Sequence, residues 1–176
     1  MSKEILYKVR TTMEAVDNRN FLYIRTFKQN SSIFMPMAVL ALIGGALLMF
    51  AMKRFGIIEF IGSFFFMFCI VFLVLILKIE LRHMRRVKDD DTGVFGNMTD
   101  ISFYEDYLAM ETTMAKGVSK LNYKDFYGLI ETRNYYIFYY TKAMATMLRK
   151  KDMKEIDASE FKGFITEKFK DKYRKL

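Results

Sequence analysis

The chain has 176 residues, with 52% hydrophobic and 16% aromatic side chains and a formal net charge of +8. That length provides one domain of moderate size, or a smaller domain with a membrane anchor. One proline and nine glycines argue against a disordered chain. The single cysteine, Cys69, excludes an internal disulfide, so nothing indicates an oxidising compartment.

Residues 1–32 precede the first long apolar segment and contain two patterns. Residues 4–13 alternate in polarity, with Tyr7 and Val9 on one side, which predicts a β-strand. Residues 14–29 have apolar side chains at helical spacing, which predicts an interfacial helix. Because the strand has no partner nearby in the sequence, we predict that it joins the C-terminal sheet and that the N-terminal segment packs on the C-terminal domain.

Two long apolar segments follow, at residues 33–52 and 58–78. The first has no charged residue, and at a rise of about 1.5 Å per residue a helix of this length crosses a hydrocarbon layer of about 30 Å. The second contains an uncharged run over 60–77. The two predict a transmembrane helical hairpin in which Ala41 and Gly45 form a small-residue contact. The alternative, two buried helices of a soluble protein, fits poorly because both segments are apolar on all sides.

Basic residues near the ends of these spans predict their orientation. The positive-inside rule places both termini of this multi-pass membrane protein in the cytoplasm. A signal peptide would begin closer to the N-terminus, so we expect neither span to be cleaved. The basic residues used are Arg19, Arg25 and Lys28 before the hairpin, Lys53 and Arg54 in the link, and Lys78, Arg82, Arg85, Arg86 and Lys88 after it.

Residues 80–91 are predicted to form a linker that is first basic and then acidic. Basic side chains beside a membrane are attracted to anionic headgroups by about 1 kcal/mol each. The acidic run 89–91 indicates a turn. The alternatives for the basic part are general headgroup contact and a specific site for a lipid or a partner. The candidate contact residues here are Arg82, Arg85, Arg86 and Lys88.

Residues 92–176 contain short alternating segments that predict six strands of an antiparallel meander. A helix follows, with Asp157 or Ser159 as its N-cap and apolar residues at helical spacing. Strands closed by one C-terminal helix are the plan of a pleckstrin-homology-like domain. The fold class is therefore α+β, with a membrane hairpin and a cytosolic meander. The predicted strands are 99–104, 106–112, 117–123, 129–132, 135–140 and 144–149.

The segment 135–140, YYIFYY, has apolar side chains on both faces. A base-stacking platform would present one exposed aromatic face with lysine or arginine interleaved, and neither residue interrupts this segment. Residues 79–176 hold 19 basic and 16 acidic side chains, whereas nucleic-acid binders have a clear basic excess. We therefore predict a core strand and no nucleic-acid partner.

The sequence contains no recognisable catalytic constellation. His83 is the single histidine, which excludes a site with several histidines, and Cys69 lies among phenylalanines inside a span. The adjacent acids Glu105 and Asp106 are predicted to lie in a solvated turn, where nothing would raise a carboxyl pKa for acid catalysis. We predict that the protein is not an enzyme and has no cofactor or metal.

A strand and helix, a two-span hairpin, the aromatic segment ISFYEDYL to RKKDM and a final EFKGFITEKF helix resemble the YcxB-like family of small bacterial membrane proteins. The resemblance extends over nearly the whole chain and implies a C-terminal domain similar to pleckstrin-homology-like modules. Lys150 and Lys151 match basic positions of the family, whereas Arg149 stands where the family tends to have proline. The resemblance implies an architecture and no activity.

These observations favour a membrane-anchored, non-catalytic binding or scaffold module. Its pleckstrin-homology-like domain would engage a protein or the lipid surface through Arg149, Lys150 and Lys151. The alternative is an accessory or immunity-type subunit of a larger membrane complex or transporter, acting through its hairpin. The expected partners are membrane lipid and, through the hairpin, another protein or a second copy of the chain.

Overall fold

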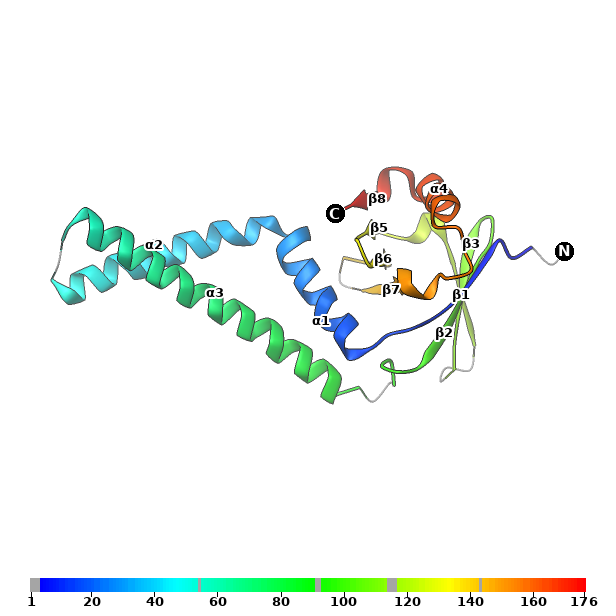
Figure 1. Cartoon of the computed structure of the whole chain (residues 1–176), viewed down its shortest axis with the longest axis horizontal. Helices are drawn as coiled ribbons and strands as arrows, with labels where there is room; N and C mark the ends of the chain where they lie inside the picture. The colour runs from blue at the N-terminus through cyan, green and yellow to red at the C-terminus, as the bar shows by residue number, and fades with distance from the viewer. Residues whose placement is uncertain (1–3, 54, 91–92, 114–116, 143) are drawn as a thin grey trace. The chain divides into compact units, whose positions relative to one another are not determined.

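A computed structural model describes residues 4–53, 55–90, 93–113, 117–142 and 144–176 (Figure 1). The chain is α+β, as predicted, and forms two compact units. Met1–Glu14 and Asp91–Leu176 make up the sheet unit, and Ala15–Asp90 make up the helical unit. Arg54, used for the predicted topology, and Asp91 of the acidic run lie outside the described residues.

The helical unit begins with α1 at Ala15–Tyr23, which continues directly into a π-helical segment, η1. The predicted interfacial helix over 14–29 is thus helical from residue 15 to residue 29 and changes its winding after Tyr23. Two long helices follow, and both are long and apolar enough to cross a membrane. The remaining elements are η1 at Ile24–Gln29, the 3-10 turn η2 at Ser31–Ile33, α2 at Phe34–Met52 and α3 at Ile57–Lys88.

Small residues allow α2 and α3 to approach each other closely. Met37, Ala41 and Gly45 recur every fourth residue and are the buried residues of α2. A Cβ atom added at Gly45 would lie 3.2 Å from the backbone nitrogen of Phe64. Because residues four apart lie on one side of a helix, they form a continuous contact line. Gly45 thus contacts the second helix, as predicted, and Ala41 is buried on the same line of α2.

α3 is longer than the predicted span. It has 32 residues and continues to Lys88, whereas we predicted that the helix ends at residue 78 and that a linker begins at 80. The hydropathy pattern ends near Leu77, but the residues that follow are good helix formers, with no glycine or proline before Gly93. Basic residues in the last turn also interact favourably with the helix dipole. The basic segment is therefore part of the helix.

The sheet unit contains two four-stranded sheets. The first has the order β1-β2-β3-β4, and the second has the order β7-β6-β5-β8. All six predicted strands are present with shifted ends, but they divide between two sheets instead of forming one meander. The strands are β1 Tyr7–Thr12, β2 Met98–Phe103, β3 Tyr107–Thr112, β4 Val118–Asn122, β5 Gly128–Glu131, β6 Tyr135–Tyr139, β7 Ala145–Arg149 and β8 Tyr173–Lys175.

The N-terminal strand adds to the first sheet, as predicted. β1 pairs antiparallel with β2, with Val9 opposite Ile101. Val9 and Ile101 are 2% and 1% exposed, so the alternating apolar residues of β1 enter the core. A segment from the start of the chain thus completes a sheet whose other strands begin at Met98.

The C-terminal helix α4, Ala158–Phe169, packs against the aromatic strand β6. Asp157 caps it by accepting hydrogen bonds from the backbone nitrogens of Ser159 and Glu160. Phe161 lies edge-on to Tyr136 with ring centres 5.5 Å apart, and Phe169 lies 5.8 Å from Phe138. All five residues of β6 are buried, which confirms that this segment is core.

The short parallel strand β8 was not predicted. The helix ends at Phe169, and Lys170 has a φ of 44°, which turns the chain before the 3-10 segment Lys170–Lys172. Tyr173 then pairs with Leu129 of β5. The spacing of Tyr173 also fits the apolar face of the preceding helix, whereas in the structure this residue starts a strand.

Candidate functional site

The end of β7 carries a buried ion pair. Arg149 is 6% exposed, and it donates hydrogen bonds from Nε and Nη2 to the two carboxylate oxygens of Asp152, at 2.7 and 3.1 Å. Its Nη1 donates to Glu14, and this hydrogen bond lowers the pKa of the Glu14 carboxyl. The Thr11 hydroxyl of β1 donates to Asp152 at 2.6 Å. Arg149 therefore joins β7 to the N-terminal segment and is not an exposed contact.

Lys150 belongs to a second cluster, around the buried Glu131. Its Nζ donates to Glu131 at 2.6 Å and lies 4.6 Å from the centre of the Tyr136 ring. The Tyr173 hydroxyl also donates to Glu131, and Lys162 lies 3.7 Å from it. Burial would raise the pKa of Glu131, but the hydrogen bonds from Lys150 and Tyr173 outweigh burial and hold it below the usual value. This cluster fastens β8 and α4 to β5.

Lys151 differs from the two preceding residues. Its side chain is 64% exposed, and its Nζ lies 3.6 Å from the Glu14 carboxylate. The 3-10 turn η4, Lys150–Asp152, follows β7 directly and directs Arg149 and Lys150 to different carboxylates of the sheet unit. Of the three contact residues predicted here, Lys151 is the exposed one.

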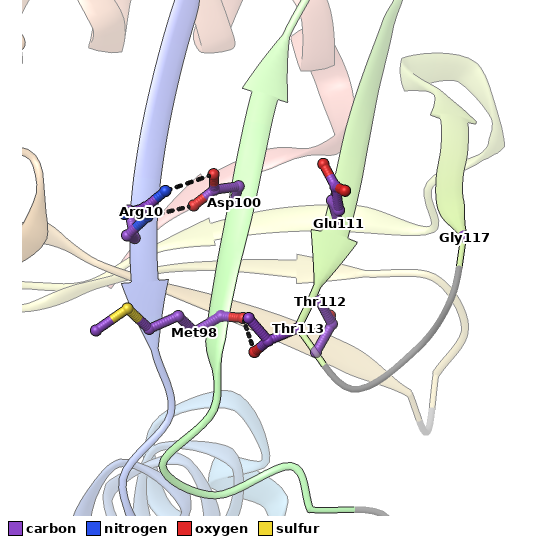
Figure 2. Close-up of a pocket in the computed structure, with 7 residues that line it drawn as sticks. All are labelled: Arg10, Met98, Asp100, Glu111, Thr112, Thr113 and Gly117. Carbon is purple, nitrogen blue, oxygen red and sulfur yellow. Dashed lines mark hydrogen bonds and ion pairs between the residues drawn. The ribbon is translucent and has the colours of Figure 1, made fainter.

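The outer face of the first sheet has a hollow of about 530 Å³. Figure 2 shows Arg10 on β1 facing Asp100 on β2, with Glu111 on the next strand. Arg10 donates to both oxygens of Asp100, at 2.7 and 3.1 Å, and Lys8 lies 3.3 Å away. The hollow is lined by Arg10, Met98, Asp100, Glu111, Thr112, Thr113 and Gly117.

The chemistry of this hollow is that of a charged sheet surface. The hydrogen bond from Arg10 is the main cause that lowers the pKa of Asp100, so this carboxyl is ionised at neutral pH. A carboxylate held by two cations is a poor proton acceptor. Glu111 is the cross-strand neighbour of Asp100, so the row across the strands runs from Arg10 through two adjacent acids to Val118. The Arg10–Asp100 pair favours this strand register, whereas the like charges of Asp100 and Glu111 oppose it.

A different hollow, of about 270 Å³, lies within the helical unit. It is formed by the segment from α1 to η2 on one side and by α3 on the other. Three of its nine lining residues are basic, and none of these described lining residues is acidic. We call it the Arg82 pocket, and its lining is Leu22, Arg25, Thr26, Asn30, Ile33, Leu75, Lys78, Ile79 and Arg82.

Polar contacts between α1 and α3 position this pocket. Glu80 accepts hydrogen bonds from Nε of Arg19 at 2.8 Å and from the Tyr23 hydroxyl at 2.7 Å. One turn further along, Nδ2 of Asn18 lies 3.1 Å from Nδ1 of His83. These contacts hold α1, and with it the start of η1, against the end of α3. His83 thus has a structural partner within the helical unit.

The predicted basic contact residues of α3 fall into two groups. All four are exposed, and Arg82 also lines the pocket, whereas Arg85, Arg86 and Lys88 do not. Arg25 was counted in the sequence only as a sign of topology. The predicted hairpin could have indicated this pocket. Because its two helices run in opposite directions, the segment before the first helix and the segment after the second lie at the same end.

The model of the YcxB-like protein family matches residues 103–165. The predicted resemblance is confirmed for this part of the chain. No curated protein and no solved structure gives a significant match.

The YcxB-like region begins at the last residue of β2 and ends within α4. It includes Arg149 and Asp152 of one cluster and Glu131 and Lys150 of the other, whereas their partners outside it are Thr11, Glu14 and Tyr173. β1 and the Arg82 pocket lie outside the matched residues. The family match therefore concerns the sheet unit and does not extend to the Arg82 pocket.

Proposed function

We propose that the chain is a membrane-anchored, non-catalytic binding module of the bacterial inner membrane. In this proposal α2 and α3 cross the membrane, and both termini lie in the cytoplasm. The sheet unit is a pleckstrin-homology-like domain held at the membrane surface. The basic end of α3 contacts anionic lipid.

The observation that carries this proposal is the surface of α3. Large apolar side chains such as Phe65, Leu73 and Val74 are 57–60% exposed along the helix. In water a continuous apolar surface of this kind favours aggregation, whereas lipid covers it without cost. The same helix then carries exposed basic residues from Arg82 to Lys88. One unbroken helix with an apolar part and a basic end fits a span that emerges at an anionic membrane surface.

The sheet unit supports the second half of the proposal. Two sheets, to which an N-terminal strand contributes, and a C-terminal helix that packs on the aromatic core agree with the plan expected for a pleckstrin-homology-like module. Because Arg149 and Lys150 are engaged with Asp152 and Glu131, the sheet unit would bind through other residues, among which Lys151 is exposed. We therefore assign the main lipid contact to α3 instead of the sheet unit.

The test uses the full chain in bacterial membranes and its single cysteine. Cys69 is exposed in the structure and lies in the middle of the apolar part of α3. If lipid surrounds α3, the protein stays in the pellet after alkaline carbonate extraction, and a membrane-impermeant maleimide labels Cys69 only after denaturation in SDS. A Lys88→Cys variant in a Cys69→Ser background is the control, and it should be labelled in inside-out vesicles.

Two results would contradict the proposal. Release of the protein by carbonate, or labelling of Cys69 in intact vesicles, would mean that α3 is not in lipid. Labelling of Lys88→Cys in right-side-out vesicles instead of inside-out vesicles would reverse the proposed orientation.

A further inference from the structure

We propose that the Arg82 pocket binds the phosphate group of an anionic glycerophospholipid. This inference rests on the proposed membrane anchoring, because it assigns the pocket to the cytoplasmic end of the hairpin. An anionic lipid and free inorganic phosphate would both offer a phosphate anion to this pocket. The experiment distinguishes these two sources.

The basic side chains of the pocket come from two separate parts of the chain. Arg25 belongs to η1, whereas Lys78 and Arg82 are four residues apart on α3. Residues four apart lie on the same side of a helix, so the two α3 cations line one wall together. Arg25 lines the opposite wall. Cations on two walls of a hollow can bind one anion from both sides, which a flat basic surface cannot do.

No described carboxylate neutralises the two α3 cations of this pocket. Glu80 is the acidic residue nearest to them in the sequence, and it is engaged by Arg19 and Tyr23 of α1. Neither Lys78 nor Arg82 forms an ion pair with any acidic residue that the structure describes. Lys78 and Arg82 lie one helical turn apart on the same wall and repel each other, and an anion in the pocket would relieve this repulsion.

The rest of the lining fits a lipid better than a free anion. Thr26 and Asn30 add neutral hydrogen-bonding groups. Ile33 and Leu75 add apolar surface, and both belong to the predicted spans. A volume of about 270 Å³ lies just below the usual range of ligand pockets, about 300–1,000 Å³, which suits a headgroup whose acyl chains remain outside.

The unusual backbone conformation around Arg25 also supports a specific binding site. η1 is a π-helix of six residues that separates α1 from η2. π-helical turns are rare, and they are frequent at functional sites. Here the π-helix supplies both Arg25 and Thr26 to the pocket, so the unusual winding coincides with the polar wall.

The experiment measures retention of single lipids by the full chain in neutral maltoside micelles, using native mass spectrometry. The probes are phosphatidylglycerol, phosphatidylcholine and inorganic phosphate. The variant Lys78→Gln with Arg82→Gln removes two lining cations. The matched control, Lys28→Gln with Lys53→Gln, removes the same charge from exposed residues of the helical unit that do not line the pocket.

We expect one phosphatidylglycerol per chain, with phosphatidylcholine retained more weakly. From the contribution of basic residues to anionic lipid binding, the pocket variant should bind about 30-fold more weakly. The control should change by at most about threefold. If the pocket variant does not fold, Arg25→Gln tests the opposite wall and should also weaken retention.

Three results would overturn the inference. Equal losses in the pocket variant and the control would mean general electrostatic attraction. Complete displacement of the lipid by inorganic phosphate would mean that the pocket binds free anions. If no lipid is retained, the pocket is not a lipid-binding site. Carbonate extraction of the same wild-type protein separates the two proposals: retention in the membrane without bound lipid contradicts the pocket alone, whereas release contradicts the anchoring.

Discussion

The guanidinium of Arg149 binds the carboxylate of Asp152 through two hydrogen bonds, and this pair is buried at the junction of β7 with the N-terminal segment. Thr11 of β1 donates to the same carboxylate. Residues far apart in the sequence thus meet at one acid, which ties the start of the chain to the second sheet. A buried charge of this kind is costly when its partner is removed.

Replacing Asp152 by alanine should destabilise the sheet unit by about 3 kcal/mol, because it leaves the buried Arg149 without its bidentate partner. Ten of the eleven tyrosines belong to the sheet unit, with Tyr23 as the exception. Near-ultraviolet circular dichroism during urea unfolding of the full chain in micelles therefore follows this unit. The control is Asp171→Ala, an exposed aspartate in a similar 3-10 turn. It should change stability by less than about 0.5 kcal/mol, and equal losses in both variants would contradict a special role for Asp152.

The cluster around Glu131 predicts a loss of stability in acid. Hydrogen bonds from Lys150 and Tyr173 hold the pKa of Glu131 below its unfolded value, which is about 4.3. The stabilisation is complete above that unfolded value and is lost as the pH falls through the lower folded pKa. Glu131→Gln should cost about 2 kcal/mol at pH 7 and should reduce the dependence of the melting temperature on pH between about 5 and 3. The exposed Glu111→Gln is the control, and an unchanged acid slope in Glu131→Gln would contradict the prediction.

Alternation of apolar residues was sufficient to find β1 and the six strands of the C-terminal part, and helical spacing was sufficient to find α4. These patterns show which face of an element is buried, so they can be recognised without knowledge of the fold. β8 could not be found in this way. It has three residues and gains its partner, β5, only after the chain reverses at Lys170.

Charge patterns were less informative about the candidate sites. Arg149, Lys150 and Lys151 look alike in the sequence, yet the structure buries the first, engages the second and exposes the third. The difference depends on Glu14 and Glu131, which are distant in the sequence and reach these residues through the fold. The Arg82 pocket was hidden for the same reason, since Arg25 and Lys78 become neighbours only through the hairpin.

The addition of β1 to the first sheet predicts that its apolar residues are needed for stability. Val9→Ala removes buried methyl groups and should cost about 2 kcal/mol in the unfolding signal of the tyrosines. Val118→Ala is the matched control, because Val118 lies on the edge strand β4 and is 51% exposed. Deletion of residues 1–10 should destabilise the sheet unit further than Val9→Ala. Unchanged melting of the truncated protein would show that β1 is dispensable.

The contact between α2 and α3 predicts different effects for two glycines of the hairpin. A side chain at Gly45 would meet backbone atoms of Ser63 and Phe64 at 3.2–3.3 Å, so the helices would have to separate. A Cβ atom at Gly62 would have nothing within 4 Å. Gly45→Leu should therefore destabilise the hairpin by about 1–3 kcal/mol, followed as ellipticity at 222 nm during heating in micelles, whereas Gly62→Leu should leave the transition nearly unchanged. Equal losses in the two variants would mean that helix packing does not depend on the small residue at position 45.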